Sequence, residues 1–86
     1  MQHGKTVRYH PNGKVELSEN YVNGVRDGKY ERYNTAGYPE ETGTFVNGMK
    51  NGKWIWYDKY GKEGVVAQFK EGQMTSMQDN TAKKSR

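Results

Sequence analysis

Residues 28–51 read GKYERYNTAGYPEETGTFVNGMKN, and the same pattern stands directly before and directly after this stretch. Residues 4–27 read GKTVRYHPNGKVELSENYVNGVRD, and residues 52–75 read GKWIWYDKYGKEGVVAQFKEGQMT. Each stretch opens with Gly-Lys and has a tyrosine at its sixth position, glycines at its tenth and twenty-first, and an aromatic residue at its eighteenth. A fixed period of this length is typical of a repeat array, in which each unit packs against its neighbours.

Each unit predicts a β-hairpin. Residues 29–34 alternate aromatic and polar side chains as a strand does, and residues 34–37 have the composition of a β-turn. A second strand follows at about residues 41–46, before the hairpin-forming pair Asn47-Gly48. Eleven glycines leave no window long enough for a stable helix. We therefore predict an all-β fold with three tandem hairpin repeats (4–27, 28–51 and 52–75), followed by a polar basic tail over residues 76–86.

The six short strands are expected to form one twisted antiparallel meander sheet. At about 4.8 Å between strands and roughly six residues per strand, the sheet would measure about 25 by 20 Å. It would be single-layered, because nothing else in the chain could cover a face. Residues 73–86 are expected to be disordered, with a short helix at 74–79 as the alternative. The basic cluster at 83–86 is expected to be solvated, or to touch an acidic partner or lipid headgroups.

The first strand of each unit presents two sets of side chains. The third and fifth positions point to one side of the sheet and are rich in Tyr, Trp and Arg, which dominate binding hot spots. The fourth and sixth positions point to the other side and include the repeated tyrosine, interpreted as a packing contact between hairpins. The candidate partner-binding residues are therefore Tyr30, Arg32, Trp54 and Trp56, with Arg8 at the margin. The alternative is that Trp54 and Trp56 form the local core.

Composition argues against several classes of function. The net charge is +4, but residues 76–86 contribute half of it, so the repeats lack the concentrated basic face that nucleic acid requires. The chain has no cysteine and no apolar run of membrane-spanning length, and a cytoplasmic location is the default expectation. No pattern of a metal site, a cofactor or a catalytic pair is present, and the adjacent Glu40 and Glu41 would point to opposite faces as solvated charges. We therefore predict that the protein is not an enzyme.

The stretch from Phe45 to Trp54, FVNGMKNGKW, resembles the MORN repeat in its bacterial variant form. The resemblance covers about residues 4–72 and is weakest at Gly64-Val65-Val66-Ala67. It implies a β-hairpin repeat fold with no catalytic motif and no cofactor. Bacterial proteins of this variant type are often labelled antitoxins or immunity-like proteins, whereas eukaryotic MORN proteins are associated with membranes and scaffolding.

Three hypotheses for function follow. The first is a cytoplasmic binding protein of a bacterium or phage that neutralises another protein, either a toxin or a host enzyme. The second is a peripheral membrane or phospholipid-associated scaffold, which the near-neutral repeats make weaker. The third is a fragment of a self-assembling repeat array, in which sheet edges pair.

Overall fold

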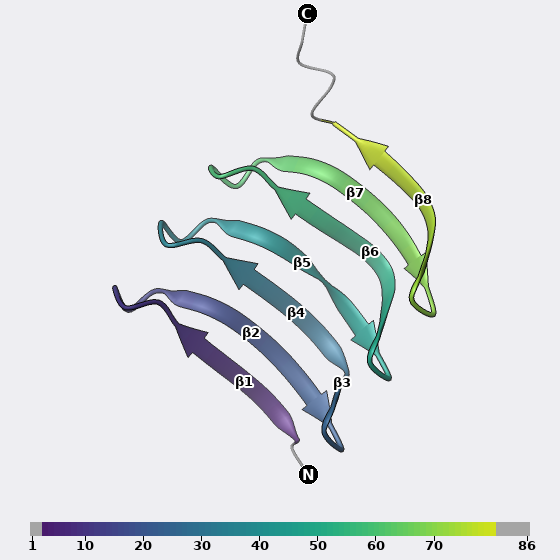
Figure 1. Ribbon diagram of the computed structural model, residues 1–86, viewed down its shortest axis with the longest axis horizontal. Coiled ribbons are helices and arrows are strands. Elements are labelled where there is room, and N and C mark those ends of the chain that lie inside the picture. Colours follow the sequence, from purple (N-terminus) through teal and green to yellow (C-terminus); the bar gives the residue numbers. More distant parts are fainter. Residues whose placement is uncertain (1–2, 81–86) are drawn as a thin grey trace, which may run out of the picture.

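The computed structural model describes residues 3–80, and this part of the chain contains strands and turns but no helix. Figure 1 shows one open antiparallel meander in the order β1-β2-β4-β5-β6-β7-β8, with the short β3 paired to β2. The prediction of an all-β fold built on one antiparallel meander sheet is confirmed. The strands are β1 (Gly4–Tyr9), β2 (Val15–Val22), β3 (Val25–Arg26), β4 (Gly28–Tyr33), β5 (Pro39–Val46), β6 (Met49–Tyr57), β7 (Glu63–Lys70) and β8 (Gln73–Asp79).

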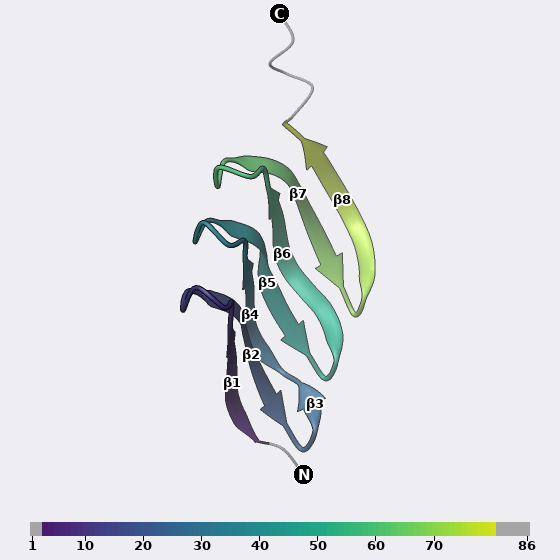
Figure 2. The same ribbon diagram turned by 60° about the vertical axis from the view of Figure 1, so that its left-hand side comes forward.

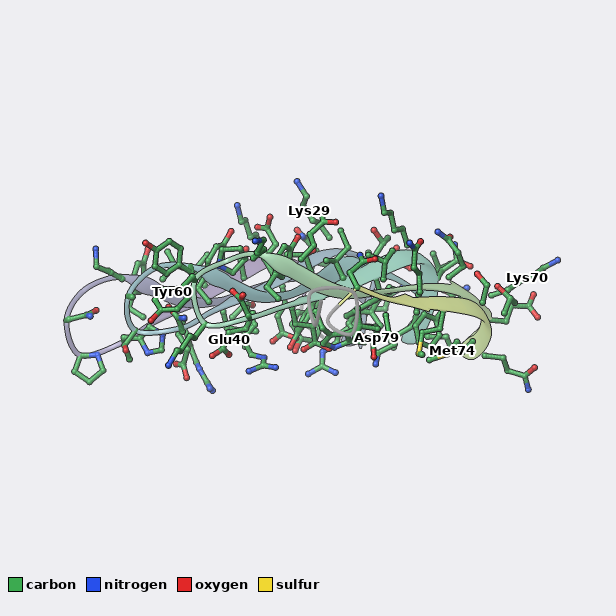
Figure 3. All side chains as sticks on the ribbon, turned by 90° about the horizontal axis from the view of Figure 1, so that it is seen from above. Lys29, Glu40, Tyr60, Lys70, Met74 and Asp79 are labelled. Atoms are coloured by element: carbon green, nitrogen blue, oxygen red, sulfur yellow. The ribbon has the colours of Figure 1, made fainter. Side chains whose placement is uncertain are left out.

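Within the described residues, the sheet is a single layer that is open on both faces. Its principal extents are 51 × 36 × 10 Å, and Figure 2 shows how the strands twist across it. In the edge-on view of Figure 3, Lys29 projects from one face and Met74 from the other, with no second layer over either. The sheet is larger than predicted because β2, β5, β6 and β7 contain eight or nine residues instead of about six, and because β8 extends it.

Two kinds of turn join the strands. The predicted turns at 10–13, 34–37 and 58–61 are each closed by a glycine N–H that donates to the carbonyl three residues earlier, at 2.9–3.0 Å. At the opposite end of the sheet are two-residue turns in which both residues have positive φ, as in a type I′ hairpin. Asn23 and Asn47 open two of these turns, whereas Glu71 opens the third at a φ of 50°, which asparagine tolerates better.

The end of the chain differs from the sequence prediction. Residues 73–79 form β8, which pairs antiparallel with β7, so the expectation of disorder or of a short helix is wrong for this segment. The Glu71-Gly72 turn reverses the chain, and Asn80 N–H donates to the Gly64 carbonyl at 2.6 Å, which ties the end of β8 to β7. The basic cluster at 83–86 lies outside the described residues.

The register assigns side chains to the two faces. Tyr30 pairs with Gly43, and Trp54 pairs with Ala67, so these four residues share one face of the sheet. We call this side the aromatic face; it also carries Arg8, Arg32 and Trp56, as the alternation predicts. The opposite side, the tyrosine face, carries the tyrosines at positions 9, 33 and 57. Of these, Tyr57 bonds Thr42 of the neighbouring strand at 3.0 Å between hydroxyls.

At the centre of the sheet, the large side chain of Trp54 packs against the backbone of Gly43, which has no side chain. Trp54 is fully buried, and a Cβ atom added to Gly43 would overlap the six-membered ring of its indole. Ala67, at 1% exposure, is the small residue on the other side. The indole Nε1–H donates to the Thr44 carbonyl at 3.0 Å, so the polar atom is also satisfied. A single-layered sheet thereby buries a tryptophan sideways between two strands.

Because no side chain fits at position 43, we expect Gly43→Ala to destabilise the fold by about 1–3 kcal/mol through overpacking. The free energy of unfolding, measured by urea denaturation, checks this. In a Trp54→Leu background the same substitution should cost less, because the smaller side chain leaves room for the methyl group. Thr44→Ala, on the exposed part of the same strand, is the control and should cost less than about 1 kcal/mol. Equal costs for Gly43→Ala in both backgrounds would contradict the proposed contact.

Candidate partner-binding face

The aromatic face is built around a cluster of rings from four strands. Trp54 of β6 contacts Phe45 of β5 with ring centroids 5.0 Å apart and Tyr30 of β4 at 5.5 Å. Phe69 of β7 lies 6.4 Å from Trp54 and 6.3 Å from Trp56. Most of these pairs have edge-to-face geometry, in which the positive ring edge meets the negative ring face. The cluster therefore fixes the orientation of every ring in it.

The five predicted partner-binding residues share this face but differ in accessibility. Arg8 and Arg32 are exposed, and Tyr30 and Trp56 are half-buried. Trp54 is the exception: its 0% exposure places it in the core, as the packing alternative expects, and removes it from the accessible surface. The reason is the contact with Gly43, which lets the indole lie flat against the neighbouring strand instead of standing out from it.

Two cations lie over the aromatic cluster. The Arg26 guanidinium is 5.3 Å from the centroid of Phe45 and 5.9 Å from that of Tyr30. Lys50 Nζ is 4.9 Å from the Trp54 centroid and about as close to Trp56 and Phe69, at 5.6 and 5.4 Å. Each charged group therefore lies within the distance of about 6 Å at which a cation–π interaction is favourable. Sequence reasoning did not select these residues, although they stand 24 positions apart.

Glutamates on this face organise the polar groups. Glu41 accepts hydrogen bonds from Trp56 Nε1 at 3.0 Å and from Arg32 Nη2 at 3.2 Å, and the Tyr30 hydroxyl lies 3.4 Å from it. Arg32 Nη1 also donates to Glu40 at 2.6 Å. The expectation that Glu40 and Glu41 point to opposite faces is therefore wrong. The strand pairing shifts between Arg32 and Tyr33, and this bulge lets both carboxylates reach one guanidinium.

A second glutamate network lies at the N-terminal side of the cluster. Glu19 is only 6% exposed, and it accepts from Arg26 Nε and, at 3.1 Å, from the Tyr21 hydroxyl. The hydrogen bond from Arg26 to Glu19 raises the pKa of the guanidinium, against the lowering effect of its partial burial. Within residues 3–80, no buried side-chain nitrogen or oxygen lacks a hydrogen-bond partner. The buried polar groups of these residues are thus satisfied by bonds within the chain.

The tyrosine face has a different chemistry. A shallow hollow near its N-terminal end is lined by Val7, Tyr9, Lys14, Glu31 and Tyr33, among others. Over the described part of the chain, no three His, Cys, Asp or Glu side chains gather as a metal site would require. That part also contains no helix able to span a membrane.

Comparisons with protein-family models, with curated proteins and with solved structures found no match to the chain. The resemblance to the MORN repeat is therefore carried by the repeated residues of the sequence alone.

Alkaline pH should weaken the fold through the tyrosines. Burial raises the pKa of Tyr30, and the nearby Glu41 carboxylate adds to this effect; burial, with Glu31, also raises the pKa of Tyr33. A group with a raised pKa in the folded state stabilises the fold below its unfolded pKa of about 10, and this contribution is lost as the pH rises through the higher folded value. The free energy of unfolding should therefore fall above about pH 10. Urea titrations at several pH values should give a shallower fall for Tyr30→Phe, and a fall as steep as that of wild type would contradict this assignment.

Proposed function

We propose that this chain is a non-enzymatic, cytoplasmic module that binds and neutralises a partner protein through its aromatic face. The activity would be that of an antitoxin, an immunity protein or a phage-type inhibitor of a host enzyme. The finer architecture that we propose is three MORN-type hairpin repeats, 4–27, 28–51 and 52–75. The offset of 24 residues between the pairs Gly4–Tyr21, Gly28–Phe45 and Gly52–Phe69 supports this architecture.

One observation carries the proposal: a large, open face of fixed aromatic and cationic side chains on a sheet with no covering layer. A standard interface needs about 800 Å² on each partner, and the outline of 51 × 36 Å leaves room for it on one face. Trp56, Tyr30 and Arg32 share the Glu41 carboxylate, so little side-chain freedom is lost when a partner docks. The buried Trp54 does not reach the surface, but its indole ring supports Tyr30 and Trp56, which pack against it.

The charges of the face indicate what the partner presents. Arg8, Arg26 and Arg32 each pair with glutamate side chains. Lys50 makes no such pair within residues 3–80, although it lies at the centre of three aromatic rings. In the first repeat, Arg26 pairs with Glu19. The second repeat has Lys50 at the position of Arg26 and Gly43 at the position of Glu19, so Lys50 has no equivalent carboxylate. The partner should therefore bring an acidic side chain, bordered by apolar groups, to Lys50.

Two lysines on one strand test the proposal. Lys50 and Lys53 both belong to β6 but lie on opposite faces, so Lys50→Glu and Lys53→Glu change the net charge equally. Affinity capture from a lysate of the native source, read by mass spectrometry, should recover one stoichiometric protein with wild type and with Lys53→Glu. Lys50→Glu should reduce its affinity about tenfold or more, as expected for a hot spot. Circular dichroism confirms that each variant is folded. Lys50→Met keeps an unbranched apolar side chain but removes the charge, so it separates the loss of charge from the loss of packing.

The tyrosine face supports a second candidate, a scaffold that lies on anionic phospholipid. Lys5, Lys29 and Lys53 follow one another on alternate strands of this face, next to exposed apolar side chains at the two-residue turns. These apolar residues are Val22, Val25, Val46 and Met49, each 42–46% exposed. In the experiment above, capture of lipid without a protein, abolished by Lys53→Glu and not by Lys50→Glu, would replace the protein-binding proposal with this one.

A further inference from the structure

A row of three tyrosines crosses the strands on the tyrosine face. Tyr9, Tyr33 and Tyr57 each end the first strand of a hairpin, at the same place in the pairing of β1, β4 and β6. One strand separates each tyrosine from the next (Figure 1), so the interval between them is two strand spacings, about 9.6 Å. Tyr9 is 61% exposed, and the other two are half-buried. The row therefore presents aromatic rings at a regular interval along one line.

The first interval of this row contains the hollow on the tyrosine face. Tyr9 and Tyr33 stand on either side of it, and its volume of about 600 Å³ lies within the usual range of small-molecule sites, about 300–1,000 Å³. Strand β2 forms the floor, with the half-buried Val15 and with Ser18, which is 8% exposed. Three charged side chains also line the hollow: Lys5, Lys14 and Glu31.

The second interval of the row is built differently. Thr42 takes the place of Ser18, and Ile55 takes the place of Glu31. The hydroxyl of Tyr57 lies 3.0 Å from that of Thr42, so this tyrosine reaches into the interval and holds a fixed position there. The pairing of Ser18 with Glu31 thus gives the first interval a polar floor beside two tyrosines.

We infer that the hollow binds a sugar residue of a linear, uncharged, β-1,4-linked glycan that lies across the strands along the tyrosine row. A pyranose ring presents C–H groups on its faces, and these pack against the negative face of a tyrosine ring. Its hydroxyls both donate and accept hydrogen bonds, so they suit a lining in which lysines donate and Glu31 accepts. A β-1,4-linked chain is extended, and every second sugar turns the same face to the protein. The interval of about 9.6 Å between tyrosines is close to the length of one such disaccharide.

The charges of the hollow favour this ligand over others that stack on tyrosine. Nucleic acid bases also stack on aromatic rings, but the Glu31 carboxylate in the lining would repel their phosphates. An apolar peptide would cover the charged groups without offering them hydrogen bonds, which is costly. The inference concerns the tyrosine face and stands independently of the protein-binding function proposed for the aromatic face.

Isothermal titration calorimetry with three soluble hexasaccharides tests the inference. Cellohexaose and N-acetylchitohexaose are β-1,4-linked and extended, whereas maltohexaose has α-1,4 linkages that coil the chain. The wild-type protein should bind at least one of the β-linked probes, and maltohexaose more weakly. Added salt should leave the affinity unchanged, because the ligand carries no charge. Binding of neither β-linked probe, or equally tight binding of maltohexaose, would overturn the inference. A single-stranded oligonucleotide that binds instead, with an affinity that falls as salt is added, would also overturn it.

Substitutions on the two edge strands locate the site. Tyr9→Ala should weaken binding of the β-linked probe about tenfold, because one stacking contact is lost. Tyr9→Phe keeps the ring and should bind nearly as the wild type does. Met77→Ala is the matched control, since Met77 is 56% exposed and lies on the aromatic face of the other edge strand. Unchanged affinity in Tyr9→Ala, or an equal loss in Met77→Ala, would refute a site at the hollow. Circular dichroism confirms that all three variants keep the sheet.

Discussion

The contact between Trp54 and Gly43 is the constraint on which the rest of the sheet depends. A single layer has no opposing layer against which to bury apolar side chains, so burial must occur sideways, between neighbouring strands. Gly43 gives the indole a flat strip of backbone, and Ala67 leaves room on the other side. The surrounding rings pack against this centre, and Trp54 becomes fully buried in a molecule whose shortest extent is 10 Å.

Long cationic side chains take the place of the missing second layer. The charged groups of Arg26 and Lys50 lie over the rings of successive hairpins, at distances that favour cation–π interactions. The two differ in how their charge is balanced, because Arg26 has Glu19 whereas the corresponding place beside Lys50 is Gly43. Within residues 3–80, the glycine that admits Trp54 therefore also leaves Lys50 without a carboxylate partner at the centre of the face. Packing and the proposed recognition of an acidic partner thus have a common structural origin.

Local sequence predicts local structure well in this chain. The turn residues predict all three four-residue turns, and alternation in the first strands places Tyr30, Arg32 and Trp56 on one face. Features that depend on contacts between strands were not predictable in the same way. The burial of Trp54 depends on a glycine eleven residues away, and the position of Glu40 depends on a bulge. Strand β8 lacks the aromatic residues that mark the other long strands and is ordered by its pairing with β7. The core could have been identified from one combination in the sequence. The third unit has a large residue, Trp54, at its third position, and the second and third units have small residues, Gly43 and Ala67, at their sixteenth positions.

If the centre of the sheet holds the structure together, the backbone around it should open least often. Hydrogen exchange of the isolated protein, resolved by residue, measures this directly. We expect the strongest protection in β5, β6 and β7 near Gly43, Trp54 and Ala67, with protection falling toward the outer strands β1 and β8. Uniform protection across all strands, or the strongest protection in β1 and β2, would contradict a fold that depends on the Trp54–Gly43 contact.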